Sequence, residues 1–114
     1  MNVVFVELPA FAVLRQAHLD EEGFRGLQQT LVANPQAGAV IRGAGGLRKL
    51  RFGDPRRGKG TRGGLRVVYF WWSEGSQFWL FTLFDKDEMT DLTPMQRATL
   101  RALLKGELRM RCRP

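Results

Sequence analysis

Residues 65–84 read LRVVYFWWSEGSQFWLFTLF and contain the strongest structural signal of the chain. Two runs of aromatic and aliphatic residues, 65–73 and 77–84, are separated by Glu-Gly-Ser, which favours a short connection between strands. Both runs are hydrophobic over nearly their whole length, which is typical of strands that are covered on both faces. The sequence therefore predicts an antiparallel hairpin at the centre of a sheet.

Residues 47–52 (LRKLRF) predict a third strand, in which Leu50 is flanked by Lys49 and Arg51. Because side chains alternate along a strand, both cations would lie on the face opposite Leu50. Residues 53–64 (GDPRRGKGTRGG) contain five glycines and one proline, so they predict a loop at one end of the sheet.

The N-terminal part predicts a short strand, residues 2–7, followed by two helices. Pro9 suits the start of the first helix, whose apolar face holds Phe11, Leu14 and His18. Asp20 suits the N-cap of the second helix, and Asn34-Pro35 would end it. The second helix has Glu21 and Glu22 in its first turn and an apolar stripe of Phe24, Leu27, Leu31 and Val32.

Thr93 and Gln96, with Pro94 between them, predict a capping box at the start of a last helix. That helix is expected to end near Gly106, which leaves residues 107–114 with little to pack against. The expected fold class is α+β in one domain, residues 1–114. Its N-terminal strand and helical hairpin precede a core of three antiparallel strands and a C-terminal helix.

The positive charge of the chain is concentrated in one stretch. Eighteen Lys and Arg residues exceed eleven Asp and Glu residues, for a net charge of +7. Residues 42–66 contain nine of these cations and a single acid, Asp54. Such segregation indicates a surface that binds polyanions, with nucleic acid as the first candidate.

Several kinds of chemistry are disfavoured by composition. One cysteine and one histidine exclude an intrachain disulfide, a cysteine-rich zinc site and two-histidine ribonuclease catalysis. His18 is expected to be a partly buried structural residue, and residues 85–88 lack the spacing of a calcium loop. We expect no metal and no cofactor. No targeting or membrane-spanning segment is evident, so we expect a cytoplasmic protein without a membrane partner.

A cationic site remains, and it suits RNA. RNA can be cleaved without a metal by its own 2′-hydroxyl, provided that cations stabilise the phosphoryl oxygens and other groups move the protons. Arginine matches phosphate with its planar fork, and Lys49 lies between Arg48 and Arg51. Most aromatic residues of the hairpin are expected in the core, and Trp72, beside the turn, is a candidate for stacking on a base.

Three segments in order resemble a known family: 45–52 (GGLRKLRF), 58–69 (GKGTRGGLRVVY) and 81–93 (FTLFDKDEMTDLT). They resemble the RelE/HigB superfamily of toxins from bacterial type II toxin–antitoxin modules. The similarity is greatest to the HigB-type branch, with its GKGxRGG loop, RxxY strand and K-[DN]-E motif. The resemblance implies a RelE/ParE-like fold and a metal-independent endoribonuclease that cleaves mRNA on the ribosome. It also implies a cognate helix-turn-helix antitoxin, with operator DNA contacted only through that partner.

The resemblance also implies roles for individual residues. Lys49 and Arg51 would flank the scissile phosphate, Arg66 would stabilise it, and Lys86 matches the lysine after the last strand. The expected RNA contacts are Arg48, Arg56, Arg57, Lys59, Arg62 and Trp72. Some relatives carry an arginine and a tyrosine after the last strand, whereas residues 88–93 contain no aromatic residue. The general base and acid are therefore open.

Three alternatives remain at this point. A ParE-like toxin that poisons gyrase would not depend on Lys49 or Arg66. A non-catalytic RNA- or ribosome-binding protein would bind RNA with a steep salt dependence and leave it intact. A DNA-binding regulator is disfavoured because no recognition helix is evident.

Overall fold

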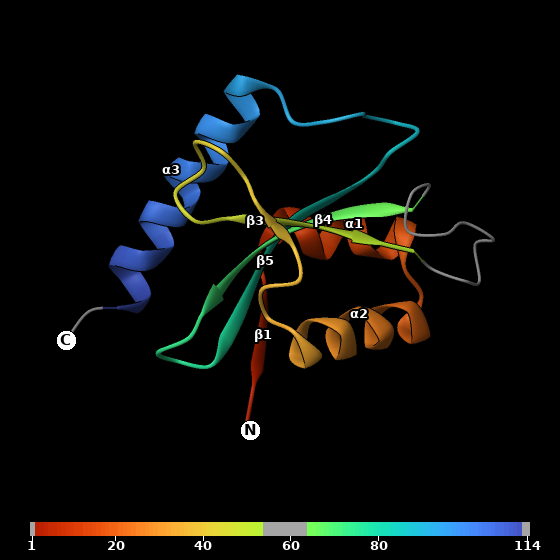
Figure 1. The fold of residues 1–114 in the computed structure, drawn as a ribbon, viewed down its shortest axis with the longest axis horizontal. Helices are drawn as coiled ribbons and strands as arrows, with labels where there is room; N and C mark the ends of the chain where they lie inside the picture. The colour runs from red at the N-terminus through yellow and green to blue at the C-terminus, as the bar shows by residue number, and fades with distance from the viewer. Residues whose placement is uncertain (1, 54–63, 113–114) are drawn as a thin grey trace.

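The computed structural model describes residues 2–53 and 64–112. Along the chain the elements are β1 (Val4–Glu7), α1 (Pro9–His18), α2 (Glu21–Ala33), β2 (Ala39–Val40), β3 (Arg48–Phe52), β4 (Leu65–Trp72), β5 (Gln77–Asp85) and α3 (Pro94–Arg111). The five strands form one sheet in the order β1-β5-β4-β3-β2 (Figure 1). The expected α+β class is confirmed. None of the described helices is long and apolar enough to cross a membrane.

The central part of the sheet agrees with the prediction. β4 pairs antiparallel with β5 and with β3. The predicted hairpin and the basic strand β3 therefore form the middle of the sheet. Two features differ from the expected three-stranded core. β1 joins the edge of β5 in parallel, and the two-residue β2 pairs antiparallel with β3. A strand of two residues is too short to produce a hydrophobic period, so the sequence contains no signal for it.

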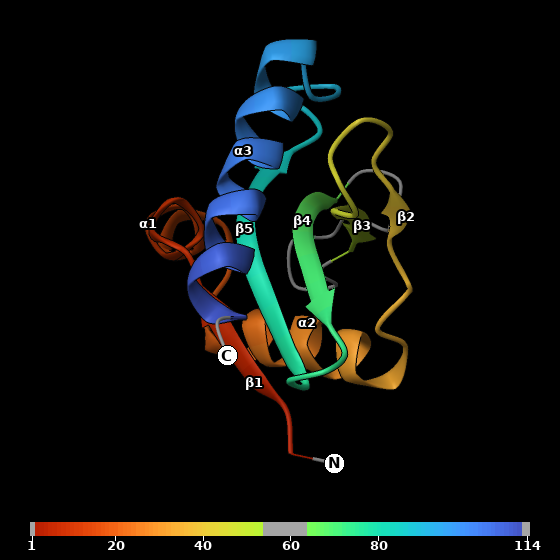
Figure 2. The same cartoon turned by 90° about the vertical axis from the view of Figure 1, so that its left-hand side faces the viewer.

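The helices cover both faces of the sheet, with α2 and α3 on opposite sides (Figure 2). On the first face α1 and α2 pack through a buried cluster that includes Phe11, Leu27, Leu31, Leu50, Val67, Tyr69 and Phe78. On the second face α3 packs through Leu100 and Leu104 against a cluster that includes Ile41, Ala44, Leu47, Val68, Trp79, Phe81 and Phe84. Two covered faces explain why β4 and β5 are hydrophobic nearly throughout.

The helix starts agree with their capping signals. The side chain of Asp20 accepts a hydrogen bond of 2.7 Å from the backbone N–H of Gly23, which caps α2. At α3, Thr93 and Gln96 form the expected reciprocal capping box. The predicted apolar stripe of α2 is wrong at Val32, whose side chain is 40% exposed.

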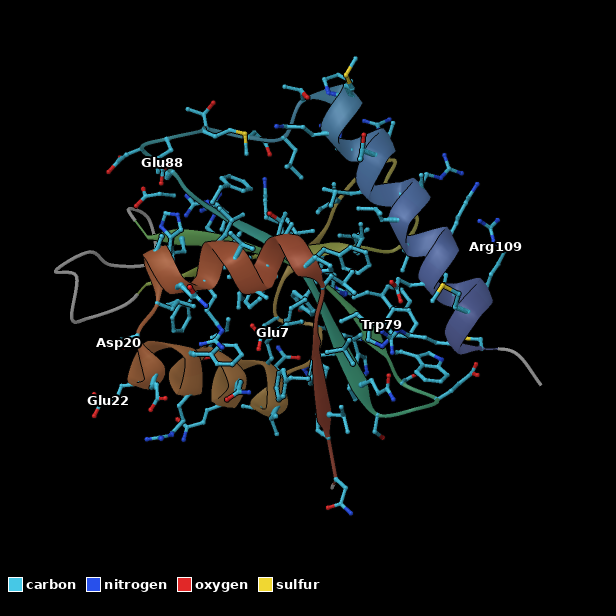
Figure 3. All side chains as sticks on the ribbon, turned by 180° about the vertical axis from the view of Figure 1, so that it is seen from behind. Glu7, Asp20, Glu22, Trp79, Glu88 and Arg109 are labelled. Carbon is cyan, nitrogen blue, oxygen red and sulfur yellow. The ribbon has the colours of Figure 1, made fainter. Side chains whose placement is uncertain are left out.

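The predicted end of α3 near Gly106 is wrong, because the helix continues to Arg111. A Cβ atom on Gly106 would meet nothing within 4 Å, so this glycine does not mark a turn or a close approach. The extra turn is held by an ion pair of 2.6 Å between Arg111 and Glu107 and by Leu108, which packs on the second cluster. In Figure 3, Arg109 projects away from the helix, whereas Trp79 lies beside its C-terminal half.

Tyr69 is the single tyrosine of the chain, and its hydroxyl forms hydrogen bonds that link residues 34–38 to the sheet. Its buried hydroxyl donates to the carbonyl of Pro35 at 2.7 Å and accepts from the N–H of Gly38 at 3.0 Å. A Cβ atom on Gly38 would lie 2.9 Å from the Tyr69 ring and 3.0 Å from the Lys49 backbone. Glycine therefore permits this close approach of the connection to β3 and β4.

We expect Tyr69→Phe to lower the free energy of unfolding by about 1–3 kcal/mol, because two backbone groups lose their partner.

Desolvation by burial raises the pKa of Tyr69 above its ordinary value of 10.0. Stability from a raised pKa is present below pH 10 and is lost as pH rises through the higher value. Denaturant unfolding across this range, followed by tryptophan fluorescence, should show a steeper alkaline loss of stability in the parent than in Tyr69→Phe, which contains no tyrosine. If the free energy of unfolding fell equally steeply with pH in both proteins, the alkaline loss of stability could not be assigned to Tyr69.

Candidate functional site

β3 and β4 bring three of the predicted catalytic cations to one face of the sheet. Arg51 is directly opposite Arg66, and Lys49 is opposite Val68, two residues farther along each strand. Alternation places Lys49, Arg51 and Arg66 together on the face that α3 partly covers. Directly opposed residues have Cβ atoms about 4.5–5.5 Å apart. These three residues are called the cationic face below.

The two arginines of this face differ in exposure. Arg66 is 7% exposed, and its guanidinium Nη1 donates to the carbonyl of Gly64 at 3.4 Å. Arg51 is exposed. A phosphate bound at this face would meet Arg66 in a medium of low dielectric constant, where the attraction between opposite charges is stronger than at an exposed residue such as Arg51.

Lys49 has a partner that sequence analysis missed. Its Nζ donates to Oδ1 of Asp91 at 2.8 Å, and 42 residues separate the two in the chain. The hydrogen bond from Lys49 is the largest cause that lowers the pKa of Asp91 below its usual range, followed by the backbone N–H of Leu92. Asp91 belongs to residues 86–93, between β5 and α3, so this connection borders the cationic face.

Lys86 and Arg48 have different positions relative to this face. Lys86 is exposed and directly follows Asp85, which is opposite Leu65, so it lies at the same end of the sheet as Arg66. Arg48 is on the other face of β3. Its Nη1 donates to the carbonyl of Gly38 at 2.8 Å, which gives Arg48 a structural contact and sets it apart from Lys49 and Arg51.

Trp72 is remote from the cationic face. It lies six positions from Arg66 on β4, about 20 Å at 3.3 Å per residue. Its ring packs on Trp79 at 5.4 Å between centroids, and it closely covers Gly75 in the hairpin turn. The structure therefore does not bring Trp72 to the cations. The remaining predicted RNA contacts, Arg56, Arg57, Lys59 and Arg62, lie outside the described residues.

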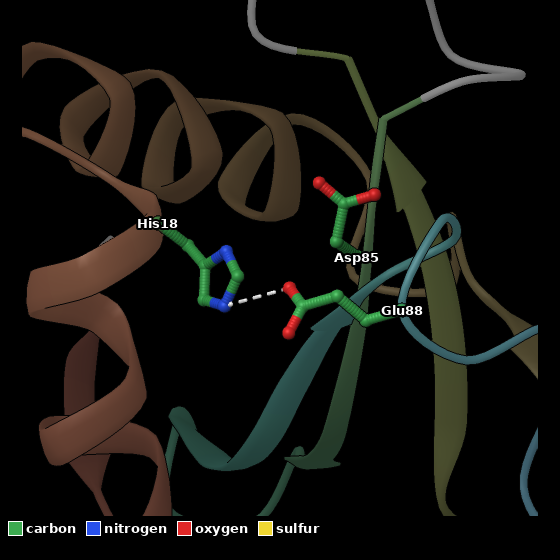
Figure 4. A group of neighbouring side chains, drawn as sticks. All are labelled: His18, Asp85 and Glu88. Atoms are coloured by element: carbon green, nitrogen blue, oxygen red, sulfur yellow. Dashed lines mark ion pairs between the residues drawn. The ribbon is translucent and has the colours of Figure 1, made fainter.

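The structure also assembles His18, Asp85 and Glu88, whose potential ligand atoms all lie within 4.8 Å of one another (Figure 4). His18 Nε2 is 3.5 Å from Glu88 Oε1, and the histidine side chain is largely buried, as expected. An imidazole and two carboxylates can also accept a divalent cation. The sequence offered no sign of this group, because His18 ends α1 and is far from residues 85–88 in the chain.

An apolar groove of about 760 Å³ lies next to this group, between α1, β5 and α3. Its described lining includes Leu14, Phe81, Met89, Leu92 and Leu103, together with His18 and Glu88. Lys49, Arg51 and Arg66 are not part of that described lining. The apolar groove and the cationic face therefore share none of these three residues and are separate features of the surface.

No family model matches the chain. Among solved structures, the chain is similar to the Escherichia coli toxin RelE, in a doubly substituted variant in the free state. The TM-score is 0.54 with 16% sequence identity, over 79% of this chain and 90% of the RelE chain. This chain has a RelE-like fold.

Proposed function

We propose that this chain is the toxin of a type II toxin–antitoxin module, of the HigB-type branch, with residues 1–114 as one toxin domain. It acts in the cytoplasm as a ribosome-dependent, metal-independent mRNA endoribonuclease that blocks translation. A cognate helix-turn-helix antitoxin neutralises it, and operator DNA is contacted only through that partner. The observation that carries the proposal is the cationic face, built from adjacent strands of a RelE-like fold by residues of the matching motifs.

The chemistry that this face supports is transesterification of RNA. The 2′-oxygen of the substrate forms a bond to phosphorus while the bond from phosphorus to the 5′-oxygen breaks. Negative charge grows on the non-bridging oxygens, where Arg51 and Arg66 provide charge-assisted hydrogen bonds. The 2′-hydroxyl loses one proton and the leaving 5′-oxygen gains another, and we assign one of these transfers to Lys49. The products are a 2′,3′-cyclic phosphate and a 5′-hydroxyl.

Mapping of RNA 5′ ends after brief induction in bacteria tests this proposal. We expect new 5′-hydroxyl ends, phased to the reading frame and confined to translated messages. The purified protein should cleave free RNA poorly, because the ribosome must hold the 2′-oxygen in line with the leaving group. Messages whose start codon is removed provide the control, since they contain the same sequence without translation.

Two other results would contradict the proposal. Growth arrest with intact messages would favour the gyrase-poisoning alternative, and RNA binding without cleavage or arrest would favour a binding protein. Efficient cleavage of naked RNA without regard to sequence would contradict ribosome dependence alone.

A further inference from the structure

A second group of cations lies outside the cationic face. Arg42, Arg97, Arg101 and Lys105 line a hollow of about 460 Å³, together with Gly43, Pro94 and Ala98. None of the described residues that line this hollow is acidic. We call these four cations the α3 site.

Helical spacing makes three of these cations a row. Arg97, Arg101 and Lys105 follow one another at intervals of four residues, so they share a face of α3. Each step advances about 6 Å along the axis at 1.5 Å per residue. This spacing is comparable to that of neighbouring phosphates along one nucleic-acid strand.

The fourth cation, Arg42, is held against this row by the connection between β2 and β3. The backbone of Ile41 donates to Leu47 at 2.8 Å, and the side chains of Ile41, Ala44 and Leu47 are buried under α3. Gly45 has a φ of 74°, and a Cβ atom there would lie 3.4 Å from Cγ of Arg101. The backbone of the connection thus lies against the helix, which fixes Arg42 beside the row.

The cations of the α3 site form no close ion pair within the described parts of the chain, although Arg97 interacts electrostatically with Asp91 at longer range. No ion pair there involves Arg42, Arg97, Arg101 or Lys105, whereas Arg15, Lys49 and Arg111 each pair with a carboxylate. Like charges that converge without a counterion repel one another, and an anion would relieve this repulsion.

The α3 site adjoins the cationic face. Lys49 Nζ donates to Asp91 Oδ1 at 2.8 Å, and Asp91 lies three residues before Pro94, where α3 begins. This hydrogen bond therefore connects the cationic face with the start of α3, which carries Arg97, and Arg97 contributes to the lowered pKa of the Asp91 carboxyl. One polyanion could extend from the cationic face past residues 86–93 to α3.

We propose that the α3 site binds the phosphate backbone of RNA, as a second site beyond the cationic face. Arginine forks match phosphate oxygens in pairs, and the spacing of the row fits consecutive phosphates. No aromatic residue is among the described residues that line the hollow. The site therefore recognises the charge and spacing of the phosphates and not the identity of the bases. This binding goes beyond the proposed activity, because it does not require that the chain cleaves RNA.

Salt-dependent RNA binding tests the α3 site. The parent is Arg66→Ala, so that the probe, a short fluorescein-labelled RNA duplex, stays intact. In this parent we expect the combined change Arg97→Gln, Arg101→Gln and Lys105→Gln to reduce the slope of log affinity against log salt by about two to three, because each neutralised phosphate contributes about 0.9. Fluorescence anisotropy gives the slope, and circular dichroism reports whether the fold is kept.

A matched pair of single variants keeps the test valid if the triple variant does not fold. Arg101→Gln and Arg25→Gln each remove one exposed helical arginine, and Arg25 is on α2, which packs on the other face of the sheet. Only Arg101→Gln should reduce the slope, by about one. Equal slopes for both variants would overturn the proposal. Displacement of the RNA by poly-glutamate at equal charge concentration would also overturn it, in favour of an acidic protein partner. This experiment measures RNA binding and not cleavage. Its result is therefore independent of whether the chain cleaves mRNA on ribosomes.

Discussion

Replacing Arg66 with alanine is expected to slow cleavage of ribosome-bound mRNA by about 10²–10³ and to abolish growth arrest. Arg66 is the buried member of the cationic face, opposite Arg51. A buried cation stabilises the charge that develops on the phosphoryl oxygens more strongly than an exposed one, because less water screens it. Single-turnover cleavage on programmed ribosomes measures the loss, and growth after induction provides the second readout.

Two variants separate this effect from a general loss of charge or fold. Arg66→Lys keeps the positive charge but loses the planar fork, so it should recover only a small part of the rate. Arg25→Ala removes an exposed arginine on the far side of the sheet and should leave the rate unchanged. Thermal unfolding of Arg66→Ala is needed because its guanidinium also donates to the carbonyls of Gly64 and Leu65. Full toxicity of a folded Arg66→Ala variant would refute the assignment.

Local signals explain which elements could be predicted from the sequence. The hairpin of β4 and β5, the Asp20 cap and the capping box at Thr93 depend on residues close together in the chain, and all are confirmed. The end of α3 depends instead on tertiary packing of Leu108, which outweighs the cost of about 1 kcal/mol for Gly106 inside a helix. Likewise, the parallel pairing of β1 with β5 joins strands that are separated in the chain by α1, α2, β2, β3 and β4, so no local pattern predicts it.

Strand register explains which part of the candidate site could be predicted. Alternation alone placed Lys49 and Arg51 on one face of their strand, but a shift of one residue would have moved Arg66 to the opposite face. The observed pairing of Arg51 with Arg66 is therefore information that only the structure provides. The same is true of Asp91, because no local pattern connects it with Lys49.

Arg48 and Trp72 show the limit of charge and composition as guides to a site. Arg48 neighbours Lys49 in the chain, yet strand alternation turns it toward the carbonyl of Gly38. Trp72 neighbours the turn at the opposite end of β4 from Arg66 and packs on Trp79. Their roles in RNA binding stay predictions, and a loss of binding in Arg48→Gln would have to be separated from loss of the contact to Gly38.

Replacing Lys49 tests whether this residue transfers a proton or only supplies charge. We expect Lys49→Ala to lower the cleavage rate by about 10²–10⁴, the usual range for a general acid or base. Lys49→Arg keeps the charge and can still pair with Asp91, but arginine does not release its proton in the working range of an enzyme. If Lys49 transfers a proton, Lys49→Arg should therefore be as slow as Lys49→Ala.

The pair with Asp91 supplies the matched control for this prediction. Asp91→Asn keeps Lys49 in place while it removes the carboxylate that binds Nζ in the protein without RNA. Because Asp91 is 57% exposed, its charge is screened by water, so Asp91→Asn should change the rate far less than either Lys49 variant. Single-turnover rates across pH distinguish the two roles: proton transfer predicts that the limb controlled by Lys49 disappears in Lys49→Arg. A Lys49→Arg variant with the parent rate and pH profile would show that Lys49 acts by charge alone, and the proton transfers would then belong to the RNA, the ribosome or other residues of the chain.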